Sequence, residues 1–281
     1  MGAAKATPVQ RARRRSGPRK TAARTPGPRP RPSRGVRWLR VVLVALLGLA
    51  AIAAAFWLSL PSAEPLRRED PPSTALIDAR AREAAARHRT ARKNQHWVRL
   101  AGISPWLLKA VVNSEDARFY LHDGVDQVET KAALTRAMEE GHLGRGASTL
   151  TQQVAKNLWL GEERSILRKV KEVALARRLE TLGKDRVLEL YLNIAEWGDG
   201  IYGADAAARV WFGKPAAQLL PEEAAILAAM LPAPRRRNPR RPSAKLKSRA
   251  AEILGLYALY RQLLPADLAA AQARLAARWP Q

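Results

Sequence analysis

The chain has 281 residues, a formal net charge of +24 and no cysteine. This length allows one domain of ordinary size with appendages, and the lack of cysteine excludes disulfides and thiolate zinc sites. The charge is concentrated at the N-terminus, because residues 1–40 hold thirteen Lys or Arg and no Asp or Glu. With almost nothing to bury, residues 1–40 are predicted to form a disordered basic tail; a nucleic-acid-binding tail is the alternative.

Val41 to Leu60 forms a stretch of twenty residues without a charge. At about 1.5 Å per residue, a helix of this length spans a bilayer core of roughly 30 Å. Trp38 and Trp57 lie near its ends, where amphipathic rings prefer the interface, and the preceding cations place the N-terminus in the cytoplasm. We expect a retained single-pass anchor rather than a buried core helix or a cleaved signal peptide, because the run is long and no clear cleavage site follows.

The segment after the anchor, residues 61–96, is predicted to be a tether. It starts rich in Pro and charge, and Ala75 to Arg92 is an Ala/Arg-rich helical stretch. A membrane-hugging amphipathic helix is one interpretation of this stretch, and a solvated spacer is the one we favour. The folded domain is expected to begin near Trp97 and to occupy residues 97–281.

Ser104-Pro105 marks a helix start, with Ser as the N-cap and Pro in the first turn. The apolar pattern that follows predicts a helix whose C-terminal end carries Glu115 and Asp116. Paired acids are unfavourable at that end of the helix dipole. Positions that break a local rule are often functional, so the pair is a candidate site.

Beyond this helix, nearly every segment shows 3.6-residue patterning, and no alternating strand or internal repeat is found. Asp199-Gly200 and Phe212-Gly213 indicate turns, and Pro232 to Pro242 indicates an extended basic loop. The predicted fold class is all-α, with one catalytic domain behind a single N-terminal transmembrane helix. The expected helices are Leu134–Glu140, Thr149–Leu160, Ser165–Leu182, Lys184–Ala195, Ala204–Phe212, Pro221–Met230, Ser248–Leu263 and Pro265–Ala277.

Glu115 follows an apolar helix and precedes two aromatic residues, so one of its sides is expected to be desolvated. Partial burial raises the pKa of a carboxyl group and suits it to accept a proton near neutral pH. A surface Glu at a helix end is the alternative. Asp116 is expected to be a local cap or salt-bridge partner, and His122 to position the turn before Gly124. The four histidines lack metal-triad spacing, so no metal ligands are expected among them.

Glu172 has cations on its own helix face, with Arg168 and Lys169 at i−4 and i−3 and Lys171 adjacent. Such neighbours favour the ionised carboxylate. An ordinary solvated helix face with charge pairs is the alternative, but apolar residues lie between the charged ones, which is not typical of a fully solvated face. Together with Lys156 and Arg164, Arg168 and Lys171 form a set suited to holding a pyrophosphate.

Ser148, Thr149, Gln152 and Gln153 are polar without charge and follow Gly144-Arg145-Gly146, where backbone can approach a ligand closely. A helix N-cap with Gln at N3 explains the same pattern, and helix N-termini also bind phosphate oxygens, so both interpretations stay open. The sequence has no GxxxxGK[ST], GxSxG or GxGxxG motif. Nucleotide hydrolysis, α/β-hydrolase chemistry and dinucleotide binding therefore have no support.

At these residues the sequence resembles the peptidoglycan glycosyltransferases, and within them the monofunctional biosynthetic transglycosylases of bacteria. Five segments match in family order and cover most of residues 97–240. They are EDARFYLHDGVD from Glu115, RGASTLTQQVAKNLWL from Arg145, RKVKEVALARRLE from Arg168, KDRVLELYLNIAEWGDGIYGADAAARVWFGK from Lys184 and LPEEAAILAAMLPAPRRRNP from Leu220.

The resemblance implies a lysozyme-like helical domain that polymerises lipid II into β-1,4-linked glycan with inversion and release of undecaprenyl pyrophosphate. It implies that Glu115 is the general base for the acceptor 4-hydroxyl. Glu172 would assist at the donor pyrophosphate, directly or through a bound divalent cation (Mg or Mn). Substrate-binding roles are implied for Ser148, Thr149, Gln152, Gln153, Lys156, Asn157, Arg164 and Lys171.

The expected partners are lipid II, the nascent glycan strand, the bilayer and other cell-wall synthesis proteins, with no nucleic acid. The expected location is the bacterial inner membrane, with a cytoplasmic N-terminus and a periplasmic catalytic domain. The last motif lies about 40 residues from the C-terminus, which leaves no room for a penicillin-binding transpeptidase domain, so the chain is expected to be monofunctional. The alternatives are a lytic glycan-cleaving enzyme and a non-enzymatic cationic membrane scaffold.

Overall fold

The structure, a computed structural model, describes residues 1–2, 34–140, 148–161 and 165–279. The chain divides into two units, Met1–Ala53 and Ala54–Gln281. Helix α1 (Arg34–Ser59) supplies the described helical part of the first unit and continues into the second. Within it, Arg37–Ser59 is long and apolar enough to cross a membrane, and none of this span is buried. A buried core helix is therefore excluded, and α1 is consistent with a single-pass membrane anchor.

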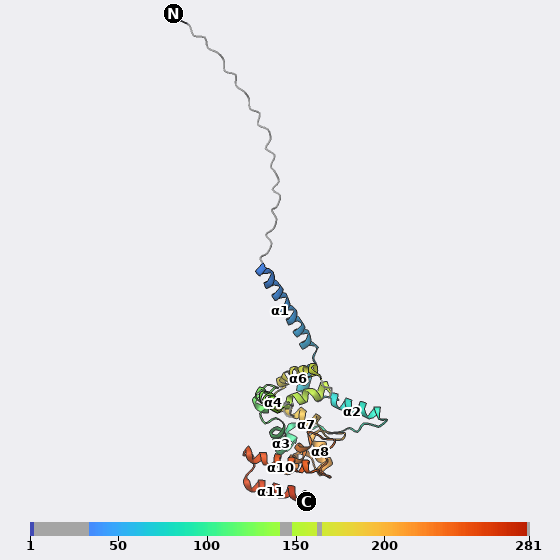
Figure 1. Cartoon of the computed structure of the whole chain (residues 1–281). Coiled ribbons are helices and arrows are strands. Elements are labelled where there is room, and N and C mark those ends of the chain that lie inside the picture. The colour runs from blue at the N-terminus through green and yellow to red at the C-terminus, as the bar shows by residue number, and fades with distance from the viewer. Residues whose placement is uncertain (3–33, 141–147, 162–164, 280–281) are drawn as a thin grey trace. The chain divides into compact units, whose positions relative to one another are not determined.

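The second unit is mostly helical among its described residues, which confirms the predicted fold class (Figure 1). Helices α8 and α9 have the predicted bounds, while α4 and α10 begin earlier than predicted, because Asp126 and Ser243 cap them. The longer helices are α2 (Ala75–Ala86), α3 (Pro105–Glu115), α4 (Gln127–Glu140), α5 (Leu150–Ala155), α6 (Ile166–Leu179), α7 (Lys184–Ile194), α8 (Ala204–Phe212), α9 (Pro221–Met230), α10 (Ala244–Leu259) and α11 (Pro265–Arg278).

Short helical turns connect several of these helices. A π-helical turn extends α5 directly, and a 3-10 turn extends α6, so the single helices predicted over these two regions each change their winding near the end. The turns are η1 (Glu64–Arg67), η2 (Leu100–Gly102), η3 (Phe119–Leu121), the π-helical η4 (Lys156–Leu160), η5 (Glu180–Leu182) and η6 (Ala216–Gln218).

A small three-stranded sheet, which the search for alternating strands did not detect, lies among the helices. Strand β1 (Asn94–Gln95) pairs in parallel with β3 (Ile201–Tyr202), which pairs in antiparallel fashion with β2 (Glu196–Gly198). Asp199 and Gly200 form the predicted turn between β2 and β3. Strands of two or three residues are too short to show the alternation that identifies a strand in a sequence.

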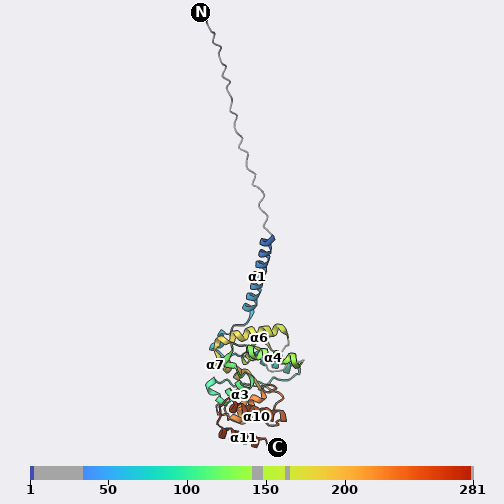
Figure 2. The ribbon, with the colours of Figure 1, turned by 60° about the vertical axis from the view of Figure 1, so that its left-hand side comes forward.

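The core of the second unit is built around α9, whose residues are all buried. A helix that is apolar on every side belongs in an interior. Helices α3, α10 and α11 pack against it, and α10 and α11 lie side by side in both Figure 1 and Figure 2. Helix α5 packs against α6 and α7. Helix α3, whose C-terminal end carries Glu115, is therefore packed against the core.

Residues before Trp97 also pack into this unit. Ala63 and Leu66 belong to the main buried cluster, and Leu76 and Ile77 of α2 form a smaller cluster with Tyr202. Thr74 caps α2 by accepting from the Ile77 backbone N–H over 3.2 Å. The compact unit thus includes residues from the segment predicted to be a tether, and the division of residues 61–281 into tether and domain stays a prediction.

Candidate active site

Helix α3 places Glu115 as predicted. Ser104 caps the helix by accepting from the Trp106 N–H, and Pro105 occupies its first turn. Leu107 and Ala110 are fully buried and hold the helix against the core. Glu115 is the last residue of the helix and remains partly accessible.

Glu115 is held by a short chain of hydrogen bonds. Gln153 of α5 donates from Nε2 to Glu115 Oε2 over 3.1 Å, and Tyr191 of α7 donates from its hydroxyl to Gln153 Oε1 over 3.3 Å. Burial raises the pKa of Glu115, and the bond from Gln153 opposes this shift. Such a carboxylate is a suitable proton acceptor at neutral pH, because its pKa is raised while the group stays partly accessible to a substrate.

A cavity of about 210 Å³ opens beside Glu115. Ser148 and Thr149 line it together with Glu115, so the structure brings these three predicted site residues to one place. The other lining residues are Asn113, Ser114, Asp116, Ala117, Arg118, Asp126 and Glu129.

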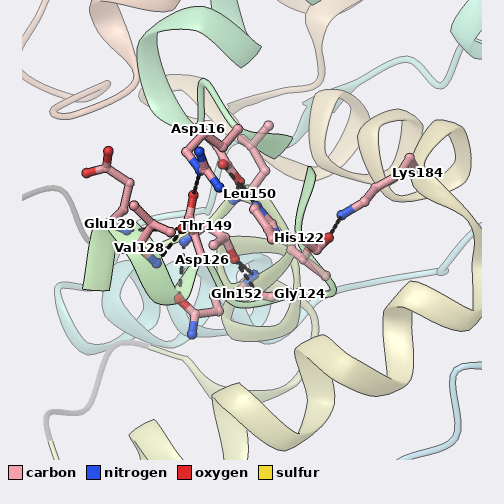
Figure 3. A network of polar contacts seen from close by, with 12 residues as sticks. Asp116, His122, Gly124, Asp126, Val128, Glu129, Thr149, Leu150, Gln152 and Lys184 are labelled. Atoms are coloured by element: carbon pink, nitrogen blue, oxygen red, sulfur yellow. Dashed lines mark hydrogen bonds and ion pairs between the residues drawn. The ribbon is translucent and has the colours of Figure 1, made fainter. Parts of the chain in front are cut away.

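Asp116 has the structural role that the sequence predicted. Its carboxylate is buried, contacts His122 Nε2 at 3.0 Å and accepts from the Leu150 backbone N–H at 2.9 Å (Figure 3). Burial raises its pKa, while the Leu150 N–H and His122 oppose the shift. Because Leu150 is the first residue of α5, this bond joins the C-terminal end of α3 to the N-terminal end of α5.

Thr149 and Gln152 form a capping box at the start of α5, as the capping interpretation predicted. Thr149 Oγ1 accepts from the Gln152 N–H over 3.2 Å, and Gln152 Oε1 accepts from the Thr149 N–H over 3.1 Å. Thr149 Oγ1 also donates to the Gly124 carbonyl over 2.7 Å (Figure 3). Gly124 has φ +80°, and a Cβ there would lie 3.0 Å from the Ala176 backbone. Both side chains are buried by these contacts, and their predicted substrate contacts stay a prediction.

Glu172 is only 3% exposed on α6, and both its oxygens are paired with cations. Arg168 Nη1 lies 2.6 Å from Oε2, and Lys169 Nζ lies 2.5 Å from Oε1. Lys169 Nζ also donates to Ser148 Oγ over 3.1 Å. Since Ser148 lines the Glu115 cavity, Lys169 links Glu172 to the rim of that cavity.

The remaining predicted residues are placed less closely around Glu115. Lys156 and Lys171 are half-buried and Asn157 is buried, and none of the three lines the Glu115 cavity. No side-chain ion pair joins Lys156 or Lys171 to another described residue. Arg164 lies outside the described residues.

A divalent cation has a poor protein-side donor set here. Within the described parts of the chain, no group of three His, Asp or Glu side chains is placed to hold a metal ion. A metal ion at Glu172 would have to displace Arg168 or Lys169 from its carboxylate. These side chains therefore fit a phosphate held by cations and not a divalent cation.

Three residues that act on Glu115 from outside the cavity lining were not predicted as site residues. Tyr191 lies in a matched segment but has no sequence signal for its contact with Gln153. Arg237 and Arg249 oppose the rise in the pKa of Glu115 through their charge. Arg237 belongs to the predicted basic loop, and Arg249 of α10 donates to the Ser114 carbonyl over 3.2 Å.

Comparison with known proteins gives a consistent result. The family model described as Transglycosylase matches residues 82–257. The chain is 45% identical over 227 residues to a protein of Rhodospirillum centenum, covering 80% of this chain and 93% of that protein. It is 40% identical over 231 residues to one of Bordetella pertussis, covering 80% and 96%. Over 167 residues it is 47% identical to one of Thiobacillus denitrificans, covering 59% and 72%.

All three relatives are named biosynthetic peptidoglycan transglycosylase. The transglycosylase domain is a lysozyme-like helical domain, in agreement with the helical second unit. The family model covers more than half of the chain, and two of the relatives match it over most of their own length. The chain therefore belongs to the peptidoglycan transglycosylase family and is a peptidoglycan glycosyltransferase.

Proposed function

We propose that this enzyme polymerises lipid II into β-1,4-linked glycan strands with release of undecaprenyl pyrophosphate. The observation that supports this most is the arrangement of two acids. Glu115 is partly buried and hydrogen-bonded, and Glu172 is held by cations, one of which, Lys169, also contacts Ser148 in the lining of the Glu115 cavity. A proton acceptor beside an anion-binding region is what transfer from a lipid diphosphate requires.

On the acceptor side, Glu115 removes the proton from the 4-hydroxyl of lipid II. The oxygen then forms a bond to the anomeric carbon of the growing chain, and the bond from that carbon to the pyrophosphate oxygen breaks. Attack opposite the leaving group inverts the anomeric centre. The raised pKa of Glu115 matches this task, because a base is most effective when its pKa approaches the working pH.

On the donor side, the leaving pyrophosphate gains negative charge as the bond breaks, and cations stabilise it there. Lys169 and Ser148 lie between the two acids, so we place the pyrophosphate near them. Glu172 holds Arg168 and Lys169 in position. Gln153 orients Glu115, and Lys156, Arg164 and Lys171 are proposed to bind phosphates and sugars of the donor, with Asn157, Thr149 and Gln152 in supporting positions.

The membrane helix fits a lipid-linked substrate. Arg37–Ser59 gives the chain a span long enough to cross a bilayer, and the basic N-terminal segment favours a cytoplasmic N-terminus. We therefore propose an inner-membrane enzyme whose catalytic unit lies in the periplasm. Its proposed partners are lipid II, the nascent strand and other cell-wall synthesis proteins.

A lytic enzyme is the competing function, because a carboxyl group with a raised pKa also suits a general acid that protonates a leaving oxygen. Cleavage of a glycan releases no pyrophosphate, so the cations around Glu172 favour the polymerase. The two functions predict opposite products from the same protein.

The test is to incubate the full-length protein in detergent with labelled lipid II, and separately with preformed glycan strands. The proposal predicts a lysozyme-sensitive polymer and free undecaprenyl pyrophosphate from lipid II, with preformed strands unchanged. Shortened strands and no polymer would show that the enzyme cleaves instead.

A further inference from the structure

A second, larger cavity lies away from Glu115. Its volume is about 370 Å³, and it shares no lining residue with the Glu115 cavity. It lies between the C-terminal end of α2, the segment that follows it and the turn between β2 and β3. Its charged lining residues are Arg80, Glu83, Arg87, Arg89, Arg92, Glu196, Asp199 and Arg235.

The cations in this cavity outnumber the anions by five to three. The three acids are all paired: Glu83 with Arg80, Arg87 and Arg235, Glu196 with Arg80, and Asp199 with Arg235. Arg89 and Arg92 have no side-chain ion pair to any described residue. Two guanidinium groups are therefore available to bind an anion, and guanidinium geometry suits carboxylate or phosphate.

Glu196 forms part of the cavity wall and lacks one hydrogen bond. The residue is 6% exposed, and Oε2 pairs with Arg80 Nε at 3.1 Å. Oε1 is buried and has no hydrogen bond of good geometry among the described residues, while burial raises the pKa of Glu196 and the Gly200 backbone N–H opposes that rise. A buried carboxylate oxygen without a well-aligned donor is unfavourable, so a donor from outside the chain would stabilise it.

The cavity wall is held in place by backbone contacts. The Arg89 N–H donates to the Ala84 carbonyl over 2.9 Å and so closes the end of α2. The Asn94 N–H donates to the Gly200 carbonyl over 2.8 Å, which joins β1 to the β2–β3 turn. Gly200 has φ +72°, and a Cβ there would lie 2.4 Å from Arg92 Cβ. Only glycine allows the segment with Arg92 to lie this close to the turn.

We propose that this cavity binds the carboxylate end of a peptide or amino acid, with Arg89 and Arg92 receiving the carboxylate and Glu196 Oε1 accepting from the adjacent N–H or ammonium group. A phosphate satisfies the two arginines, and its P–OH is a donor, but its negative charge is repelled by the Glu196 carboxylate, whereas a backbone N–H or an ammonium group is not. An amino-acid end supplies both halves of the match. The ligand is either free in solution or part of the peptide branches that peptidoglycan carries.

The inference does not depend on the proposed polymerase chemistry. The test measures binding of alanyl-alanine to the full-length protein in detergent by calorimetry. Alanyl-alanine amide lacks the carboxylate, propionate lacks the donor, and inorganic phosphate lacks both the N–H and the carboxylate. We expect the dipeptide to bind most tightly and the other three probes to bind about tenfold more weakly or worse.

The matched variants are Arg89→Ala/Arg92→Ala and, as control, Arg82→Ala, an exposed arginine of α2 outside the cavity. The double variant should bind the dipeptide about tenfold more weakly, while the control binds it normally. Both should polymerise lipid II at the unchanged rate, which separates this site from the polymerase site. Glu196→Gln should weaken the dipeptide and leave propionate unaffected.

Two results would overturn the proposal. One is equal binding of the dipeptide and its amide, and the other is tighter binding of phosphate than of the dipeptide. Absence of dipeptide binding would also overturn it unless peptide-bearing glycan fragments bind and lose that binding in the double variant. In that case the peptide branch is the source, and fragments stripped of peptide should not bind.

Discussion

Gln153 donates a hydrogen bond to the carboxylate of Glu115 over 3.1 Å, which joins α5 to the last residue of α3. The bond stabilises the ionised form of Glu115 and so lowers its pKa, whereas burial raises it. Tyr191 in turn donates to the carbonyl of the same amide and so fixes which end of it faces Glu115. The basicity of Glu115 is thus raised first by burial and moderated by Gln153, which Tyr191 holds in place.

Replacing Gln153 with Ala should shift the acid limb of the pH profile of kcat/KM. The hydrogen bond lowers the pKa of Glu115, so its loss raises that pKa further. A base must be deprotonated to act, so the acid limb should move to higher pH. Tyr191→Phe should move it in the same direction by a smaller amount, because Gln153 remains. An acid limb that stays in place or moves to lower pH in Gln153→Ala would contradict this role.

Glu172 and Lys169 should act as a coupled pair. Glu172→Gln is expected to lower polymerisation by about 100-fold or more, because Lys169 and Arg168 lose the partner that positions them toward the donor. Lys169→Met, which removes only the ammonium group, should lower it similarly. In a double-mutant cycle, the two losses in kcat/KM should be strongly non-additive. Additive losses would mean that the two residues act independently.

Asp116 should be essential to stability and not to the chemistry. Asp116→Ala leaves the buried Leu150 N–H and His122 without a partner, so the free energy of unfolding should fall by about 2–4 kcal/mol. Asp116→Asn keeps an acceptor for Leu150 and should lose less. Chemical denaturation in detergent measures both. Equal stability of Asp116→Ala and the unchanged protein would show that the joint between α3 and α5 contributes little.

The end of α1 should contribute to the stability of the catalytic unit. Arg178 donates to the carbonyls of Trp57, Leu60 and Pro61 and stacks over the Trp57 ring at 4.5 Å. A protein that starts at Ala54 should keep the thermal stability of the full chain. In one that starts at Ser62, the free energy of unfolding should fall by about 2 kcal/mol, and the unfolding temperature should fall by several degrees.

Arg178→Ala provides the control for that truncation. It should destabilise the protein that starts at Ala54 and have little further effect on the one that starts at Ser62, where its partners are already gone. If Arg178→Ala destabilises both proteins equally, Arg178 acts through contacts other than the end of α1.

The sequence was sufficient for features that depend on neighbouring residues. Ser104 and Pro105 marked the start of α3 by local capping chemistry, and the apolar run that followed carried the helix to Glu115. The ion pairs of Glu172 with Arg168 and Lys169 follow directly from helical spacing. Such features need no knowledge of the rest of the fold.

Features that depend on distant residues could not be predicted in the same way. Asn94 of β1 pairs with Ile201 of β3, far along the chain, and strands this short leave no periodic signal. The contact of Tyr191 with Gln153 likewise arises only when α5 and α7 pack together. Thr149 and Gln152 show the opposite problem, because one local pattern predicted both a helix cap and a ligand site. The structure shows the cap, and the ligand site stays a prediction.

The Glu115→Gln variant should differ from the unchanged protein in thermal stability, and this difference shows whether the variant is folded. Burial raises the pKa of Glu115 in the folded state above its ordinary value of 4.5. The ionised group therefore destabilises the fold at pH values above the folded-state pKa, and this penalty disappears as pH falls toward 4.5. Glu115→Gln should unfold at a higher temperature than the unchanged protein at pH 8, and the difference should shrink as the pH is lowered.

The most direct measurement is the initial rate of polymer formation from labelled lipid II by Glu115→Gln, compared with the unchanged protein at the same pH. If Glu115 is the general base, the variant should remain folded and lose about 100- to 10,000-fold in rate, the range typical of a lost proton acceptor. A folded Glu115→Gln protein that forms polymer at a near-normal rate would contradict the assignment.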